Sequence, residues 1–358
     1  MRAGHRQKGP LLMQIHIILE PDLPANELRE LGLLAESQGI AGLWVQNYAT
    51  AGDAFMNLVP LAQASSRIRL GVVIVSPQEA HPLKIATSLL TLNEFSRGRA
   101  MVALGRGGEW LGAIGGQYSP NVQALQEAIT IVRHAARGKG RAKHGFSVPG
   151  KHYRAQYFRT PWVTVDQPAL VYAGVTRDRM LAMGAQTADG VMLADLGLPR
   201  VAADRVRVIR EALAAGNRPA GELRISNFVG WHVKEDPAAV AFEARRELVI
   251  RAWLVRDWLA HFLTPEENEI VQKNKQAFIN TYRERKGTVE GVPETIIEKL
   301  IGGLTITSTA DRMDEPLQRL RDFAAAGLDE ICLRLHDDPA DSIRIIGRHV
   351  IPKFPSAT

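Results

Sequence analysis

Short apolar segments alternate with amphipathic helical segments along almost the whole chain, and this alternation constrains the fold more than any other feature. The apolar segments are continuous runs, which is typical of parallel strands that are buried on both faces. Helical segments between them carry apolar residues on one side only. The segments that we expect to form strands are Gln14–Leu19, Gly42–Gln46, Ile68–Ile74, Ala100–Leu104, Pro168–Gly174, Asp189–Asp195, Leu223–Val233 and Asp329–Leu335.

Eight strand–helix units predict an α/β fold of the TIM-barrel type, a closed (β/α)8 barrel. An open doubly wound sheet is the alternative that the alternation leaves open. We expect a single barrel domain over residues 13–355, preceded by a disordered N-terminal extension over residues 1–12. Two insertions are expected: a hairpin near residues 138–160, after the fourth helix, and a long helical insertion near residues 238–303, close to the seventh strand.

The composition limits the classes of function. The net charge is +6, but charges of both signs are spread along the helical segments, and no motif for nucleic-acid binding accompanies them. The single cysteine, Cys332, lies in an apolar run, which fits a buried thiol in a reducing cytoplasm. No apolar run reaches the ~20 residues of a membrane span. No spacing of histidine or cysteine indicates a metal site. We therefore expect a cytoplasmic protein that binds neither nucleic acid nor membranes.

Glycine clusters follow two neighbouring strands. Gly105, Gly107 and Gly108 come after the fourth strand, and Gly174, Val175 and Thr176 come after the fifth. In a barrel these positions lie at the C-terminal ends of the strands, where ligand sites form. Glycine lets a ligand approach the backbone closely, and the start of a helix attracts phosphate. A tight turn explains the first cluster equally well, and Thr176 could simply cap the next helix.

Three segments together resemble the bacterial-luciferase-like flavin oxidoreductases, closest to the methylenetetrahydromethanopterin-reductase-like branch. They are SPQEAHP, LTLNEFSRGRAMVALGRG and YAGVTRDRMLAMGAQTADGVMLAD. The resemblance covers nearly all of residues 14–350. Members of this family are (β/α)8 barrels, often homodimers, that bind FMN or the deazaflavin coenzyme F-420 at the C-terminal ends of the strands. The resemblance also implies a non-prolyl cis peptide bond between Val73 and Ile74, at the end of the third strand.

The resemblance assigns residues to the cofactor. The end of the third strand would lie beside the ring, the glycines after the fourth strand along the cofactor chain, and the turn after the fifth strand around its phosphate. The end of the sixth strand would line the same pocket. The cofactor-binding residues implied in this way are Val73, Ile74, Val75, Ser76, Gly105, Gly107, Gly108, Gly174, Val175, Thr176, Ala194 and Asp195.

Three side chains are candidates for chemistry. Glu20 ends the first strand, and a carboxyl group facing a partly apolar cavity there would have a raised pKa and could transfer a proton. Asn47 stands where many relatives carry histidine; its amide can hydrogen-bond a ring carbonyl but cannot act as a base. His81, before Pro82, could approach the ring or fix its own loop. Glu79 and Glu109 are weaker candidates, and Trp110 and Trp231 either wall a substrate pocket or belong to the core.

These expectations favour an oxidoreductase that binds coenzyme F-420 and transfers a hydride to or from a small organic substrate, with the protein supplying position and proton transfer. One alternative is an FMN-dependent monooxygenase that receives reduced flavin from a partner reductase. A second alternative is a flavin-binding barrel without catalytic activity. The resemblance favours a homodimer in each case, and the substrate is not specified by the sequence.

Overall fold

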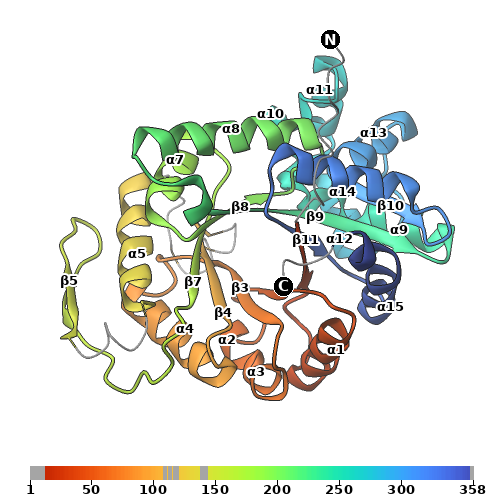
Figure 1. The fold of residues 1–358 in the computed structure, drawn as a ribbon. Coiled ribbons are helices and arrows are strands. Elements are labelled where there is room, and N and C mark those ends of the chain that lie inside the picture. Colours follow the sequence, from red (N-terminus) through yellow and green to blue (C-terminus); the bar gives the residue numbers. More distant parts are fainter. Residues whose placement is uncertain (1–12, 108–110, 112–114, 116–120, 138–143, 355–358) are drawn as a thin grey trace, which may run out of the picture.

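Eight parallel strands close into a barrel in the computed structural model, which describes residues 13–107, 111, 115, 121–137 and 144–354. Each strand pairs with its neighbours, and β11 pairs with β1 to complete the circle (Figure 1). The prediction of a (β/α)8 TIM barrel is confirmed. The barrel strands are β1 (Gln14–Leu19), β2 (Gly42–Gln46), β3 (Arg69–Val75), β4 (Ala100–Leu104), β7 (Leu170–Gly174), β8 (Gly190–Ala194), β9 (Arg224–Lys234) and β11 (Glu330–Arg334).

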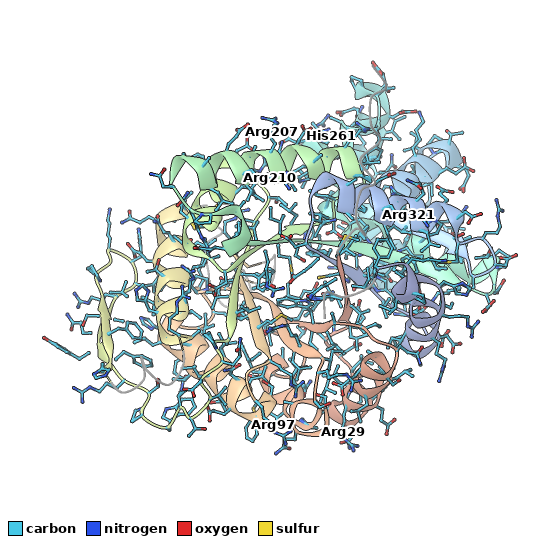
Figure 2. All side chains as sticks on the ribbon, in the orientation of Figure 1. Arg29, Arg97, Arg207, Arg210, His261 and Arg321 are labelled. Carbon is cyan, nitrogen blue, oxygen red and sulfur yellow. The ribbon has the colours of Figure 1, made fainter. Side chains whose placement is uncertain are left out.

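Helices surround the strands on the outside of the barrel (Figure 1). The segment 54–64 looks like one helix in the sequence but forms two, because Pro60 near the start of the second cannot donate a hydrogen bond to the preceding turn. Long polar side chains such as Arg207 and Arg210 project from the outer faces (Figure 2). The surrounding helices are α1 (Ala25–Ser37), α2 (Ala54–Asn57), α3 (Val59–Ala64), α4 (Pro82–Ser96), α5 (Val122–Ala135), α7 (Asp178–Thr187), α8 (Pro199–Ala215), α14 (Asp314–Ala326) and α15 (Pro339–Ile345).

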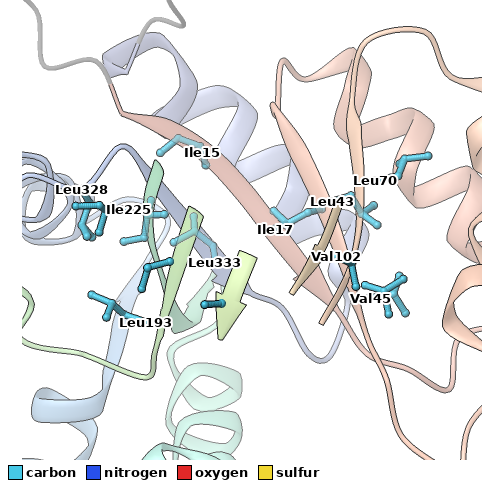
Figure 3. Packing of buried hydrophobic residues seen from close by; sticks show 14 of the residues in the cluster. Ile15, Ile17, Leu43, Val45, Leu70, Val102, Leu193, Ile225, Leu328 and Leu333 are labelled. Carbon is cyan, nitrogen blue, oxygen red and sulfur yellow. The ribbon is translucent and has the colours of Figure 1, made fainter. Parts of the chain in front are cut away.

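The core has two layers. One lies between the strands and the helices and includes Ile15, Leu43 and Val102 (Figure 3). The other fills the barrel interior and includes Trp44, Tyr172 and the buried Cys332. The deeper part of the interior is polar; Tyr172 and Glu330 are completely buried there, and Arg224 is partly exposed. The Tyr172 hydroxyl donates to Glu330, 3.0 Å away, and Arg224 lies 2.8 Å from the same carboxylate. Side chains therefore close the barrel at its N-terminal end and leave the C-terminal end for a site.

A hairpin of β5 (Phe146–Val148) and β6 (Ala155–Phe158) follows α5, where the sequence predicts one. The buried Glu127 carboxylate accepts hydrogen bonds from the backbone N–H groups of Lys151, His152 and Tyr153 at its turn, at 2.8–2.9 Å. The Tyr153 hydroxyl donates to the carbonyl of Pro77, 2.8 Å away. These bonds fix the turn against the loop that follows β3.

The helical insertion follows β9 and leads into a strand that the sequence analysis misses, β10 (Thr305–Thr309). Its sequence, TITST, has no continuous apolar run, and it pairs in parallel with the second half of β9. The insertion packs around its own apolar cluster, which includes Leu248 and Phe278. Its helices are α9 (Pro237–Arg246), α10 (Arg256–Leu259), α11 (Pro265–Lys273), α12 (Lys275–Arg283) and α13 (Glu294–Leu304), with short 3-10 turns at η3 (Glu247–Ile250) and η4 (Ala252–Leu254).

Candidate functional site

The end of β3 breaks the regular alternation of its strand. The peptide bond between Val73 and Ile74 is cis, which confirms the prediction for this bond. The register with β4 shifts between Val73 and Val75. Two consecutive side chains, those of Val73 and Ile74, consequently pack with the cluster inside the barrel, whereas Val75 packs with the helices outside. The shift gives the barrel mouth an apolar bulge at the half-buried Ile74.

Gly105 and Gly174 make room for this bulge. A Cβ atom on Gly105 would lie 2.6 Å from Cγ2 of Ile74, and one on Gly174 would lie 2.2 Å from its Cδ1. The same Cβ on Gly105 would lie 3.1 Å from the carbonyl oxygen of Gly174, so the two turns are adjacent at one end of the barrel. A side chain at either strand end would therefore displace Ile74.

The loop after β4 is fastened to the loop after β3. Gly107 has a φ of +85°, which favours glycine, and a Cβ there would lie 3.0 Å from Cβ of Ser76. The Ser76 hydroxyl is buried and donates to the carbonyl of Arg106, 3.0 Å away. Ser76 thus holds two loops together. Gly108, Glu109 and Trp110 lie outside the described residues.

Asn47 and Glu79 form a pair beside the bulge. The Asn47 amide donates to Oε1 of Glu79 at 2.8 Å and to the carbonyl of Ile74 at 3.4 Å. The same carboxylate oxygen accepts the N–H of Ser76 at 2.9 Å. Burial raises the pKa of Glu79 to about 7, even though these two hydrogen bonds favour the ionised form. A carboxyl group that titrates near neutral pH therefore lies next to the predicted cofactor residues.

The turn after β7 leads into the uncapped start of α7. Val175 is buried among the outer core residues, and its N–H donates to the carbonyl of Met192. Thr176 is partly exposed, and Arg177 occupies the capping position without a side-chain hydrogen bond to the helix. Thr176 does not cap α7. The first N–H groups of this helix, beside the Thr176 hydroxyl, remain suited to an anion.

The end of β8 contacts the helical insertion. Ala194 is partly exposed, and Asp195 has a φ of +52°. One carboxylate oxygen of Asp195 accepts the N–H of Ala252 at 3.1 Å, and the other lies 3.7 Å from the guanidinium of the fully buried Arg251. Burial raises the pKa of Asp195, while Arg251 and Arg334 oppose that rise. Asp195 therefore also has a structural role, because it anchors the turn that carries Ala252.

Glu20 lies on the opposite side of the mouth, among charged groups instead of in the apolar cavity that the sequence suggests. Its Oε1 is 2.8 Å from Nδ1 of His336 and 3.3 Å from Nε of Arg334. His336 also contacts the Arg251 guanidinium through Nε2. Burial, followed by the charge of Arg251, lowers the pKa of His336 well below its ordinary value. The ring is therefore neutral, and its Nδ1 faces Oε1 of Glu20.

Several groups in this charged region lack a hydrogen-bond partner among the described residues. They are Nε and Nη1 of Arg251, Oδ1 of Asp195, Oε2 of Glu247 and Nε2 of His232. A cavity of about 220 Å³ next to them is lined by Glu20, Tyr282 and His336, among others. A larger cavity of about 590 Å³ lies outside the barrel, between α9 and β10. No residue that we predict for the site lines the larger cavity, so we place the candidate site at the barrel mouth.

Other predicted residues have structural positions. His81 is exposed, and its Nδ1 accepts the N–H of Leu83 at the start of α4, so it fixes its own loop. Trp231 is buried between the barrel and the helices and does not wall a pocket. The sequence analysis missed Arg334 and His336; a charged residue directly after the apolar run Ile331–Leu333 was the signal that could have revealed them.

The luciferase-like monooxygenase family model matches residues 6–330 of the chain. The chain belongs to this family. The resemblance noted in the sequence is thereby confirmed, together with the prediction of an oxidoreductase of the luciferase-like superfamily. Among the described residues, no helix is long and apolar enough to cross a bilayer, and no three potential metal ligands converge.

Individual relatives resemble the chain over its whole length. A 5,10-methylenetetrahydromethanopterin reductase from Archaeoglobus fulgidus is 24% identical over 351 residues, covering 96% of this chain and 100% of the relative. A solved coenzyme F-420-dependent tetrahydromethanopterin reductase from Methanopyrus kandleri has a TM-score of 0.79 at 19% identity, again covering 96% and 100%. A diketocamphane monooxygenase component from Pseudomonas putida, solved with FMN, has a TM-score of 0.61 at 16% identity, covering 97% and 100%.

Proposed function

We propose that this protein binds coenzyme F-420 at the C-terminal mouth of its barrel and transfers a hydride to or from a small organic substrate. The observation that carries the proposal is the bulge at Ile74, seated on Gly105 and Gly174 between three adjacent strand ends. It offers an apolar surface on the same side of the mouth as the uncapped start of α7. A flat ring with a phosphorylated chain needs both features.

The residues present fit such a cofactor. Ile74, Gly174 and Ala194 are partly exposed and would contact the ring, and the Thr176 hydroxyl with the first N–H groups of α7 would hold the phosphate. Val75, Ser76 and Val175 are buried, so their backbone rather than their side chains would reach it. The bound deazaflavin would supply the two-electron hydride chemistry.

The opposite side of the mouth fits the substrate. Arg251 is completely buried, two of its guanidinium nitrogens lack partners among the described residues, and a nearby oxygen of Asp195 does as well. Buried polar atoms of this kind are normally satisfied, so a polar molecule or water belongs beside them. The chain's contribution is to orient a polar substrate across from the bulge and to exclude bulk water.

An FMN-dependent monooxygenase supplied by a partner reductase is the second candidate. It is favoured by the likeness to the monooxygenase solved with FMN. The oxygenase component of a flavin-dependent trigonelline monooxygenase from Acinetobacter baylyi also matches, at 26% identity over 122 residues. We place this candidate second because those likenesses are either weaker in TM-score or shorter than those to the two reductases. A homodimer in a cytoplasmic setting remains part of either proposal.

Titration of the purified protein with each cofactor tests the proposal. We expect coenzyme F-420 to bind with saturable quenching of its fluorescence, and more tightly than FMN. Oxygen consumption with reduced FMN, and no binding of F-420, would favour the monooxygenase instead. If neither cofactor binds, the proposal is wrong. Thr176→Ala should weaken binding of the phosphorylated cofactors more than binding of riboflavin, which lacks the phosphate.

A further inference from the structure

Glu79 lies beside the bulge at Ile74. It lies on the loop between β3 and α4, and its Oε1 accepts hydrogen bonds from both the Asn47 amide and the Ser76 N–H. Its Oε2 receives no hydrogen bond from the described residues, so this oxygen is the one left for a ligand. The Asn47 amide that holds Oε1 also reaches the carbonyl of Ile74. One amide thus links the carboxyl group to the surface proposed for the cofactor ring.

Glu79, which is hydrogen-bonded to Asn47, can exchange a proton, whereas Asn47 itself cannot. An amide does not exchange protons near neutral pH, whereas a carboxyl group in a partly desolvated position does. Glu20, the alternative carboxylate at the mouth, is engaged by the Arg334 guanidinium and the His336 ring. Glu79 has no such cationic partner among the contacts described for it: its two donors are a neutral amide and a backbone N–H.

We infer that Glu79 is the proton donor and acceptor of this site, and that the substrates are compounds whose reduction adds a proton together with a hydride, as a carbonyl group does. This inference rests on the proposed function. In the reducing direction, the proton leaves Oε2 of Glu79 and bonds to the carbonyl oxygen. A bound reduced deazaflavin would supply the hydride to the carbonyl carbon and would itself become oxidised, the C=O π bond would break, and an alcohol would form. The Glu79 carboxylate then regains a proton from solvent.

The surroundings of Glu79 determine how its titration responds to substitution. The charged and titratable groups on the neighbouring described segments are Asp53 before α2, His81 at the start of α4, Tyr153 on the hairpin and Arg106 after β4. Burial raises the pKa of Glu79 to about 7, the hydrogen bonds from Ser76 and Asn47 oppose that rise, and the negative charge of Asp53 adds to it. Asn47→Ala should therefore raise the pKa further, and Asp53→Asn should lower it.

The first test needs no turnover. The carboxyl of Glu79 is titrated by carbon-13 NMR in side-chain-labelled protein, with E79Q used to assign its signal. We expect a midpoint near 7, opposite shifts in N47A and D53N, and a further change of the signal when coenzyme F-420 is added. A midpoint near the ordinary value of ~4.3, or a signal that the cofactor leaves unchanged, overturns the inference.

The second test uses a carbonyl or alcohol substrate found with the cofactor-loaded protein. We expect the pH dependence of kcat to show a limb near pH 7 that disappears in E79Q, whose kcat falls at least 100-fold while cofactor affinity stays within threefold. E79D should restore part of the rate. The matched control is Glu30→Gln, on the exposed face of α1. If the cofactor binds and turnover occurs but E79Q keeps the limb, only this inference fails; if neither cofactor binds, the proposed function fails with it.

Discussion

At the scale of single residues, the site depends on two glycines that have no side chain as much as on the side chains that are present. Gly105 and Gly174 are adjacent because the strands that carry them pair, and one isoleucine occupies the space that both leave. Asn47 and Glu79 show the complementary case, in which two polar side chains from different loops hydrogen-bond each other at the same bulge.

Gly174→Ala tests the packing of Ile74 against Gly105 and Gly174. The new methyl group would lie 2.2 Å from Cδ1 of Ile74, so the isoleucine must change rotamer or the turn must move. We expect a loss of about 1–3 kcal/mol in the free energy of unfolding and about tenfold weaker cofactor binding. Chemical denaturation and fluorescence titration measure the two effects. Gly221→Ala is the matched control, because no atom lies within 4 Å of a Cβ there; equal behaviour of the two variants would contradict the packing argument.

Glu36 gives a pH dependence whose sign follows from its contacts. Burial opposes its ionisation, but the N–H groups of Ile68, Arg67 and Ser66 outweigh it and lower the pKa to about 2. A carboxyl group whose pKa is lower in the folded state than in the unfolded state stabilises the fold. This stabilisation is fully present at pH values above the pKa of the unfolded state, which is ~4.3. That stabilisation is lost as the pH falls towards 2.

We therefore expect Glu36→Gln to lower the free energy of unfolding at pH 7 by about 1 kcal/mol, a value reduced for solvent screening of this partly exposed group. The difference between variant and wild type should shrink between pH 4.5 and pH 2. Urea denaturation at several pH values measures it. A difference that stays constant over this range would show that the carboxylate charge is not the cause.

At the scale of elements, the sequence predicts what depends on local periodicity. All eight barrel strands were predicted because each contains a short apolar run, such as AMVAL in β4 or FVGW in β9, and the hairpin was predicted from its Pro-Gly turn. β10 was missed because TITST is polar and is a strand only through its pairing with β9. The mouth residues Arg334, His336 and Arg251 could not be assembled from the sequence, since β11 and the insertion come together only in three dimensions.

Glu127→Ala tests how the hairpin is attached. The substitution removes the acceptor of three backbone N–H groups at residues 151–153. Donors left without a partner are costly or become hydrated, so we expect the turn to loosen. Hydrogen exchange at these three amides should accelerate at least tenfold, while exchange in the barrel strands changes little. Glu30→Ala on α1 is the control, and unchanged exchange in the Glu127 variant would mean that the Tyr153 contact alone holds the turn.

At the scale of the whole molecule, the two ends of the barrel differ in how they are filled by side chains. The N-terminal end is closed by buried side chains, among them Tyr172, whose hydroxyl donates to Glu330, and Trp44, whose indole donates to His16 at 3.2 Å. Two buried atoms there, Nε2 of His16 and Nη1 of Arg69, lack a hydrogen-bond partner among the described residues. The C-terminal end has a larger group of such atoms, around Arg251, and a cavity of about 220 Å³ that Glu20 and His336 help to line. A closed N-terminal end and a cavity at the C-terminal end fit a fold in which the first supplies stability and the second supplies the site.

Tyr172→Phe tests the sealed end. It removes a hydrogen bond to the fully buried Glu330 carboxylate, which Arg224 still contacts. We expect a loss of about 1–3 kcal/mol in the free energy of unfolding, measured by denaturation, with cofactor affinity unchanged. Tyr157→Phe is the matched control, because that side chain is 86% exposed and should have no effect. A larger effect on cofactor affinity than on stability would contradict the division between the two ends.

The change of partner along β9 has a consequence for how this barrel can be altered. On one edge β9 pairs with β8 as far as Phe228 and with β10 from Gly230 onward, and its last four residues, Trp231–Lys234, pair with β10 alone. The helical insertion therefore leads directly into a strand of the sheet, β10, and is not a detachable loop. A variant in which this insertion is shortened, or replaced by the insertion of a related enzyme, must retain β10. Without β10, the backbone N–H and C=O groups at the end of β9 would be unpaired, and an exposed strand edge of this kind promotes aggregation.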